Sequence, residues 1–165
     1  MRQNVAIQAE RADPATPIPE IYVDSDQILQ VIVNVVKNAI QALPEGGVIR
    51  VSMGVVRKRL VERSALGRRA SDRLEARQPV PEQDAIEIRV SDNGPGIPAA
   101  TLARVFDPFF TTRAQGSGLG LSICQTIVRE HGGVIAIEST VGQGTTVTID
   151  LPVEKRHGTR RTDPR

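Results

Sequence analysis

Two glycine-rich segments constrain the fold of this chain more than any other feature. The first, Asp92-Asn93-Gly94-Pro95-Gly96, places a carboxylate at the end of an apolar run and then a turn that small residues allow. The second, Gly116-Ser117-Gly118-Leu119-Gly120, is a glycine loop that leads into a helical pattern. Glycines let backbone N–H groups approach an anion, and a helix N-terminus adds unpaired donors and the positive end of its dipole. Together the segments predict a site for ATP, in which one reads the adenine and the other holds the phosphates.

An amphipathic helix is expected upstream of these segments. Asp24 is a good N-cap, and the helical pattern runs to about Leu43, before Pro44 and Gly46-Gly47. The apolar face of this helix is expected to hold Ile28, Leu29, Ile32, Val33, Val36, Ile40 and Leu43. Asn34 and Asn38 are four residues apart and share a different face. Their carboxamide oxygens suit Mg²⁺, although the pair alone also fits two exposed polar positions.

The remaining patterns place strands on both sides of the helical segments. Alternating apolar residues predict strands near residues 4–9, 49–55, 86–90, 134–138 and 145–151. Pro98 is expected to begin a short helical turn, residues 104–118 to form a lid, and residues 119–128 to lie in a helix that ends before His131-Gly132-Gly133. Because the chain ends strand–strand, the order favours a mixed sheet with helices on one face over a doubly wound sheet.

Composition limits the classes of function. The 165 residues fit one domain, expected over 1–153, and aromatic residues are only 2%, so aliphatic residues must form the core. The formal net charge of +2 gives no reason to expect nucleic-acid binding. Basic residues gather in 57–83, interpreted as a loop or insertion, and in 154–165, interpreted as a disordered tail. With one cysteine, Cys124, no intrachain disulfide can form, which fits a cytoplasmic setting.

Four motifs in this order resemble one known family. They are Asn34-Val-Val-Lys-Asn38-Ala39, Asp92-Asn-Gly-Pro-Gly96-Ile97, Phe106-Asp-Pro-Phe109-Phe110-Thr-Thr-Arg113 and Gly116-Ser-Gly-Leu-Gly120-Leu121. They resemble the N, G1, F and G2 boxes of the catalytic, ATP-binding domain of sensor histidine kinases, which belongs to the GHKL superfamily with gyrase, heat-shock and mismatch-repair ATPases. Two stretches, Gln41-Ala42-Leu43 and Phe-Phe-Thr-Thr-Arg, are similar in sequence to the nitrogen-regulation-like branch of this family.

The resemblance implies a fold and a site. The fold would be the Bergerat fold, a two-layer α/β (α+β) sandwich with a mostly antiparallel sheet of about five strands and about three helices on one face. Asn38 would ligate Mg²⁺, and Asp92 would hold the adenine amino group, with Thr145 acting through a bound water. Asn34, Lys37 and Arg113 would act in catalysis. Phe106, Phe109 and Phe110 would pack the hinge of the lid, although a core role explains them equally well. The residues expected to contact ATP are Asn34, Asn38, Asp92, Gly94, Gly96, Ile97, Phe110, Thr111, Gly116, Ser117, Gly118, Leu119, Gly120, Leu121 and Thr145.

The resemblance also implies that part of the machinery lies elsewhere. The phosphate acceptor of the family is a histidine on a separate dimerising helix pair, and neither His131 nor His157 has that sequence context. The chain is therefore expected to be a catalytic domain cut from a longer, homodimeric kinase. Its partners would be the dimerisation domain of that kinase and, through it, the receiver domain of a response regulator.

Three other functions stay open at this point. A hydrolytic ATPase of the same superfamily typically has Glu where Asn34 stands, and Asn cannot act as a general base at neutral pH. A stand-alone serine kinase of the anti-sigma type usually has Glu at the same place. A nucleotide-sensing or scaffold module without chemistry is disfavoured by the four intact motifs.

Overall fold

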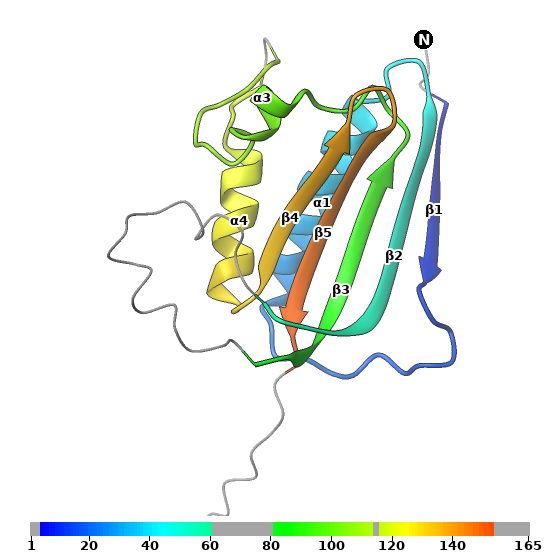
Figure 1. Ribbon diagram of the computed structural model, residues 1–165, viewed down its shortest axis with the longest axis vertical. Helices are drawn as coiled ribbons and strands as arrows, with labels where there is room; N and C mark the ends of the chain where they lie inside the picture. The colour runs from blue at the N-terminus through cyan, green and yellow to red at the C-terminus, as the bar shows by residue number, and fades with distance from the viewer. Residues whose placement is uncertain (1–3, 61–80, 114–115, 154–165) are drawn as a thin grey trace, which may run out of the picture.

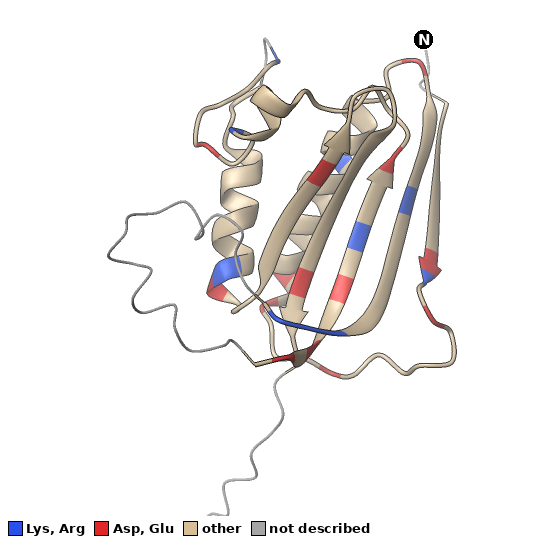
Figure 2. Ribbon diagram, viewed as in Figure 1, with Lys and Arg blue, Asp and Glu red and all other residues tan. Residues whose placement is uncertain are grey.

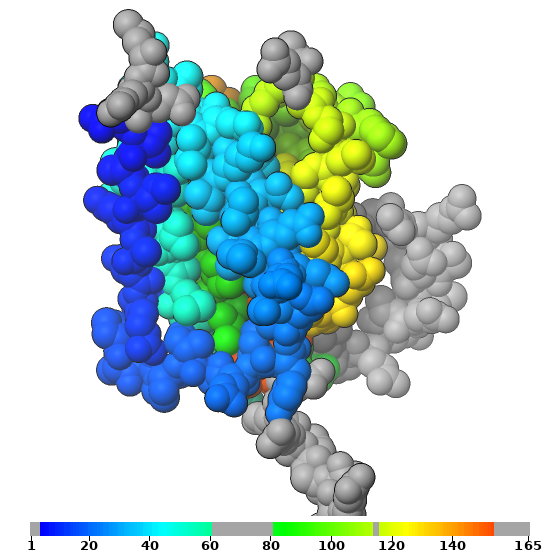
Figure 3. Space-filling model, turned by 180° about the vertical axis from the view of Figure 1, so that it is seen from behind, coloured from blue at the N-terminus to red at the C-terminus, as the bar shows by residue number. Residues whose placement is uncertain are grey.

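The computed structural model describes residues 4–60, 81–113 and 116–153. Within them, a five-stranded sheet is covered on one face by helices (Figure 1). The elements are β1 (Val5–Arg11), α1 (Ser25–Gln41), β2 (Gly47–Lys58), β3 (Gln83–Asp92), α3 (Ala99–Leu102), α4 (Gly120–Glu130), β4 (Val134–Thr140) and β5 (Gly144–Pro152). Figure 3, seen from the helical side, shows α1 and α4 next to each other in front of the sheet.

The sheet has the order β1-β2-β3-β5-β4. β1 pairs with β2 in parallel, from Val5 opposite Gly47 to Arg11 opposite Met53, and the other described neighbours are antiparallel. The fold class expected from the sequence is therefore confirmed: a mixed, mostly antiparallel sheet with helices on one face. The central strand β3 ends at Asp92, opposite Thr145 near the start of β5, so the first glycine-rich segment lies at one end of the sheet.

Helix α1 begins where the sequence predicts and ends earlier. The Oδ1 atom of Asp24 accepts the backbone N–H groups of Asp26 and Gln27 at 3.0 and 3.1 Å, so Asp24 is the N-cap. The helix ends at Gln41 and is capped by Ala42, rather than running to about Leu43. Leu43 is still buried in the core, which is why the apolar pattern extends past the last helical residue.

The buried side of α1 differs from the expected face. Its buried residues are Ile28, Val31, Val35 and Ala39. Leu29 and Val33, which were expected to be buried, are 58% and 54% exposed, whereas Ile32, Val36 and Ile40 flank the core. Apolar residues occupy more than half of the circumference of this helix, so the sequence could not tell which of them form the centre of the buried stripe.

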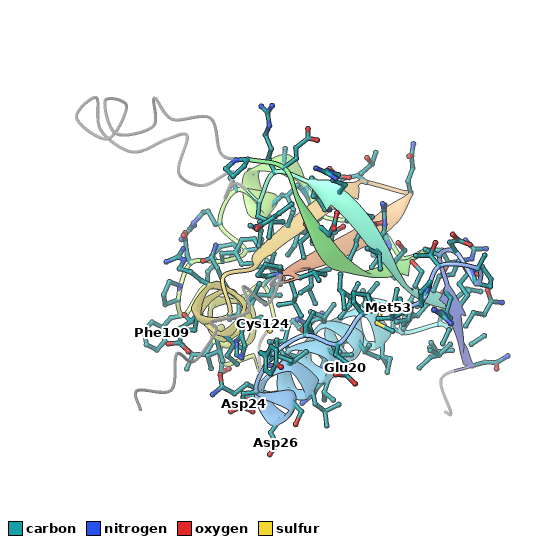
Figure 4. The ribbon with its side chains drawn as sticks, turned by 90° about the horizontal axis from the view of Figure 1, so that it is seen from below. Glu20, Asp24, Asp26, Met53, Phe109 and Cys124 are labelled. Carbon is teal, nitrogen blue, oxygen red and sulfur yellow. The ribbon has the colours of Figure 1, made fainter. Side chains whose placement is uncertain are left out.

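The core lies between the sheet and the helices. Its fully buried side chains include Ile49, Val90, Val128, Ile149 and Leu151. Cys124 is also fully buried, between α4 and α1, as Figure 4 shows. Burial raises the pKa of its thiol, which keeps the sulfur protonated. Cys124 is therefore a small residue of the core.

His131 joins the end of α4 to the start of α1. Its Nε2 atom accepts the backbone N–H of Asp24 at 3.0 Å, and its Nδ1 atom lies 2.8 Å from the carbonyl oxygen of Ile127. Since Nε2 accepts, Nδ1 must carry the hydrogen and donate it to Ile127. The ring thus connects the N-cap of one helix with the last turn of the other.

Charged residues of both signs lie along the strands of the sheet (Figure 2). Lys58 Nζ lies 2.7 Å from Glu87 Oε2 and 2.7 Å from Asp150 Oδ1. Burial raises the pKa of Asp150. For Lys58, burial acts to lower the pKa, but the hydrogen bonds to Asp150 and Glu87 outweigh burial, so the pKa of Lys58 is raised. Lys58 is the last residue of β2 and Gln83 the first of β3, so the ends of the expected 57–83 loop belong to strands. Residues 61–80 and the expected tail from 154 lie outside the described residues.

Candidate nucleotide-binding site

Asp92 is the last residue of β3 and is half-buried. Its Oδ1 atom accepts the backbone N–H of Gly94 at 2.9 Å. Burial raises the pKa of the carboxyl group, and the N–H groups of Gly94 and Thr145 act in the opposite direction. A carboxylate fixed by its own turn, with further lone pairs available, can accept a hydrogen bond from an exocyclic amino group.

The turn after Asp92 packs closely on the hairpin formed by β4 and β5. Gly96 has a φ of +71°, and a Cβ atom there would lie 2.1 Å from the carbonyl oxygen of Thr140. Across the same contact, Gly142 donates its N–H to the carbonyl of Pro95 at 2.8 Å. Only glycine allows both this backbone conformation and this approach at position 96. The Asp-x-Gly-x-Gly pattern is thus explained by a contact between backbones.

Ser139 is a residue of this region that was not expected from the sequence. Its hydroxyl accepts the N–H of Ile97 at 2.8 Å, and it lies 2.9 Å from the carbonyl oxygen of Gly144 and 2.9 Å from Thr145 Oγ1. Asp92, Ser139 and Thr145 line a recess of about 190 Å³. A serine in an alternating strand carries no local signal for its contact with Ile97, because Ile97 lies 42 residues away in the chain.

Helix α1 brings Asn34 and Asn38 to the side that faces α4. Both are partly buried, and the side chain of Asn34 hydrogen-bonds the Cys124 thiol of α4. A Cβ atom on Gly94 would lie 3.1 Å from the carbonyl oxygen of Ala42, so the Asp92 turn abuts the end of α1. Lys37 is exposed; it follows Asn34 by three residues but lies about 100° from Asn38 around the helix. The structure therefore groups the two asparagines and places Lys37 beside Asn34 but not beside Asn38.

The three phenylalanines of the predicted lid have different surroundings. Phe106 packs against the core, and the Phe110 ring lies 4.4 Å from the guanidinium carbon of Arg104. Phe109 is 75% exposed, has a φ of +66° and lies at the periphery of Figure 4. The expectation that Phe109 packs the hinge is wrong, because the backbone at this position turns its ring to solvent.

The glycine loop leads directly into α4. Gly118 has a φ of +67°, and a Cβ atom there would lie 2.4 Å from the backbone of Phe109, whose N–H donates to the carbonyl of Gly118. Ser117 Oγ accepts the N–H of Leu119 at 3.4 Å, but among the described residues no side chain caps the first turn of α4, which begins at Gly120. The first N–H groups of this helix are therefore available to an anion.

Arg113 connects the predicted lid to α1. Its Nη1 atom donates to Asn38 Oδ1 at 3.1 Å and to Gln41 Oε1, and its Nη2 atom donates to the carbonyl oxygen of Asn38 at 3.3 Å. Gln41 was not among the site residues expected from the sequence. Its position three residues after Asn38, on the same side of a helix, was the available signal.

Residues 23–155 match the family described as histidine kinase-, DNA gyrase B-, and HSP90-like ATPase. The chain belongs to this family. It is 34% identical over 160 residues to sporulation kinase E of Bacillus subtilis (strain 168), an alignment that covers 97% of this chain and 18% of that kinase. It is 35% identical over 153 residues to the sensory histidine kinase/phosphatase NtrB of Rhizobium leguminosarum bv. phaseoli, covering 93% and 36%.

A solved structure agrees with these relatives. The catalytic domain of the histidine kinase ThkA, in a nucleotide-free form, has a TM-score of 0.63 and 29% identity, covering 90% of this chain and 79% of that one. The resemblance to histidine kinase catalytic domains and the fold class are thereby confirmed. The chain spans about a fifth of sporulation kinase E and about a third of NtrB.

The arrangement fits the nucleotide of this ATPase family. At one end, Asp92 supplies the acceptor that an adenine amino group needs. At the other end, Gly118 and the uncapped start of α4 supply the N–H donors that a polyphosphate needs. In the described part of the chain, no group of three or more His, Cys, Asp or Glu side chains could hold a metal ion. A metal at this site would therefore rely on nucleotide phosphates and on a single amide oxygen such as that of Asn38.

Within residues 4–60, 81–113 and 116–153, no helix combines the length and the apolar character needed to cross a bilayer.

Proposed function

We propose that this chain is the ATP-binding phosphotransfer domain of a sensor histidine kinase and donates the γ-phosphoryl group to a histidine of a separate dimerisation domain. The observation that carries the proposal is the placement of Asp92, Asn38 and the uncapped N-terminus of α4 around one end of the sheet. Together they offer an adenine acceptor, a metal ligand and phosphate donors, which phosphoryl transfer requires as positioning groups.

The roles of individual residues follow from their contacts. Asp92 would accept the adenine amino group, with Thr145 supporting this side through a water. The glycine loop and the first turn of α4 would bind the phosphates through N–H groups. The nucleotide contacts proposed beyond these are Gly94, Gly96, Ile97, Phe110, Thr111, Gly116, Ser117, Leu119 and Leu121. Asn38 would ligate Mg²⁺, which neutralises phosphate charge when it is bound. Arg113 is the cation proposed for the transferred phosphoryl group, and Asn34 lies beside the metal ligand.

In the proposed reaction, the bond between the γ-phosphorus and the bridging oxygen breaks while a P–N bond forms with the acceptor imidazole. ADP leaves with the electron pair, and the imidazole proton passes to a base of the acceptor domain. Asn34 stands where a water-activating base would be needed for hydrolysis, and a carboxamide cannot take that proton. This residue favours phosphotransfer over the hydrolytic alternative.

The context of the parent protein is part of the proposal. Its dimerisation domain would supply the acceptor histidine and make the parent a homodimer, and a response regulator would receive the phosphoryl group from that histidine. The domain would work in the cytoplasm, where ATP is available. The NtrB relative supports a nitrogen-regulation-like branch.

The decisive experiment combines this chain with the histidine-bearing helical domain of its parent kinase and radiolabelled ATP. We expect an acid-labile, base-stable phosphohistidine on that partner, no label on this chain, and loss of labelling with Asn38→Ala. The variant Gln30→Ala, at an exposed site of α1, is the matched control and should label normally. Brisk ATP hydrolysis by this chain alone, abolished by Asn38→Ala, would contradict the proposal and favour the ATPase reading.

A further inference from the structure

The guanidinium of Arg113 rests on the last turn of α1. It donates to Asn38 Oδ1 at 3.1 Å, to the backbone carbonyl of Asn38 at 3.3 Å and to Gln41 Oε1. Arg113 and Gln41 are exposed and 72 residues apart in the chain. Three oxygen atoms of α1 thus accept hydrogen bonds from one guanidinium. Among the described residues, the segment that carries Arg113 makes no other side-chain hydrogen bond to α1.

Two features of the fold favour this position of Arg113. Helix α1 has no basic residue in its last turn, so its negative end lacks a cation of its own. The backbone of Arg113 is also part of a local turn: its N–H donates to Thr111 Oγ1 at 3.1 Å, and its carbonyl accepts the N–H of Gly116 at 3.1 Å. The turn orients the side chain, and the helix end attracts it.

This contact uses the oxygen atom that the proposed function assigns to the metal. A guanidinium and a divalent cation repel each other and cannot both lie against one amide oxygen at contact distance. Gln41 offers the guanidinium a neutral acceptor next to Asn38, and it is not itself needed for the metal. Its side chain therefore decides how firmly Arg113 stays on Asn38.

We propose that Gln41 is a positioning residue: it holds Arg113 on Asn38 in the nucleotide-free chain, so that nucleotide-bound Mg²⁺ must displace Arg113 from Asn38 Oδ1. The inference rests on the proposed function for the role of the metal, and on the structure alone for the contact. Gln41 thus sets the metal dependence of nucleotide binding, and it keeps Arg113 next to the place that the phosphates would occupy.

The contact is tested first without nucleotide. Hydrogen exchange should be faster at residues 109–113 and at Gly116 in Gln41→Ala than in the parent chain, because Arg113 loses an acceptor. Gln30→Ala makes the same change of residue type on an exposed face of α1 and should leave this exchange unaltered. Equal exchange in Gln41→Ala and Gln30→Ala would overturn the assignment of Gln41.

The competition is tested by calorimetry with ADP, which lacks the γ-phosphate that would itself attract Arg113. Gln41→Ala should tighten ADP binding in Mg²⁺ about two- to fivefold, the range expected for an exposed, charge-assisted hydrogen bond, and tighten it less in a chelator. In an Arg113→Ala background, Gln41→Ala should change nothing. The same tightening in that background, or weaker binding, would overturn the proposal. If the unsubstituted chain bound no nucleotide, the proposed function would be refuted. The hydrogen-exchange comparison of Gln41→Ala with Gln30→Ala would still decide whether Gln41 holds Arg113.

Discussion

The two ends of the candidate site are built in different ways. At the adenine end, Asp92 and its turn are fixed by backbone contacts with the β4–β5 hairpin: Gly96 lies against Thr140, and Gly144 lies against Asp92 itself. At the phosphate end, the contacts between α1 and the predicted lid are made by the side chains of Arg113 and Gln41, which are exposed, and of Asn38, which is partly buried. One end belongs to the folded core of the sheet, and the other is a surface contact.

This difference separates two kinds of mutational effect. A change at the adenine end should disturb folding as well as binding, because the same atoms serve both. A change at the phosphate end should act on nucleotide or metal binding and leave the free energy of unfolding nearly unchanged, since exposed side-chain contacts contribute little to stability.

The largest effect is expected at Gly144. Its φ is +101°, and a Cβ atom would lie 2.0 Å from the carbonyl oxygen of Asp92, so Gly144→Ala must displace β3 or β5. We expect a loss of more than about 4 kcal/mol in the free energy of unfolding, or no folded protein at all. Gly142→Ala is the control, because φ there is +80° but the space is open; its cost should be about 1–2 kcal/mol. Urea denaturation of both variants measures the difference, and equal costs would show that the close approach is unimportant.

Asp92 is expected to give the next largest effect, on binding. Asp92→Ala should lose a charge-assisted hydrogen bond to the adenine, about 1.5–3 kcal/mol, which is roughly a ten- to hundredfold loss of ADP affinity. Calorimetry with ADP measures it, after circular dichroism has shown that the variant is folded. Unchanged ADP affinity in a folded variant would remove Asp92 from the site.

The pH dependence of ADP binding sharpens this assignment. Burial raises the pKa of Asp92 above its ordinary 3.8, so protonation on acidification removes the acceptor at a higher pH than it would for an exposed aspartate. ADP affinity should fall as the pH is lowered through the folded-state pKa. The linked effect on stability has the opposite direction, because a raised pKa favours the folded state at low pH and that contribution is lost as the pH rises. Asp92→Asn should lack this part of the pH dependence; an identical profile for both proteins would contradict it.

A smaller and more selective effect is expected at Asn38. Asn38→Ala should weaken ADP binding about three- to tenfold in Mg²⁺, since a ligand of the ion is lost, and less in a chelator. Its thermal midpoint should stay close to that of the parent chain. Calorimetric titrations with ADP, in Mg²⁺ and in a chelator, measure the loss of affinity under each condition. Equal losses would mean that Asn38 has only a structural role.

The smallest effect is expected at Phe109. Its ring is mostly exposed and its φ is positive, a conformation that Asn tolerates better than most residues. Phe109→Asn should therefore change the free energy of unfolding by no more than about 0.5 kcal/mol. Phe106→Asn, at a side chain that packs against the core, should cost clearly more. Similar costs for both variants, measured by urea denaturation, would show that the two rings have equivalent surroundings.

The sequence predicted the elements because their signals are local. Each signal lies within a few residues of the element it determines: Asp24 caps the start of α1, apolar alternation marks β2 and β3, and Gly132 follows the end of α4. The mixed sheet with helices on one face followed from the order of these elements. The resemblance to known motifs added the site residues, and their roles toward ATP stay predictions.

What the sequence could not predict depends on contacts between distant segments. Ser139 meets Ile97, and Gln41 meets Arg113, through the packing of elements that no local pattern places together. Leu29 and Val33 carry the same apolar signal as their buried neighbours, and only the position of α4 and the sheet decides which side of α1 is covered. Phe109 is exposed because its backbone conformation, set by the approach of Gly118, directs the ring outward.

The position of His131 has a consequence for the choice of phosphoryl acceptor. An imidazole attacks phosphorus through an unshared electron pair on nitrogen, and the pair on Nε2 of His131 is engaged by the N–H of Asp24, while Nδ1 carries the hydrogen given to Ile127. Phosphorylation of this ring would first have to detach the cap of α1 from the end of α4. A domain proposed to modify histidines thus holds one of its own in a form that is a poor nucleophile.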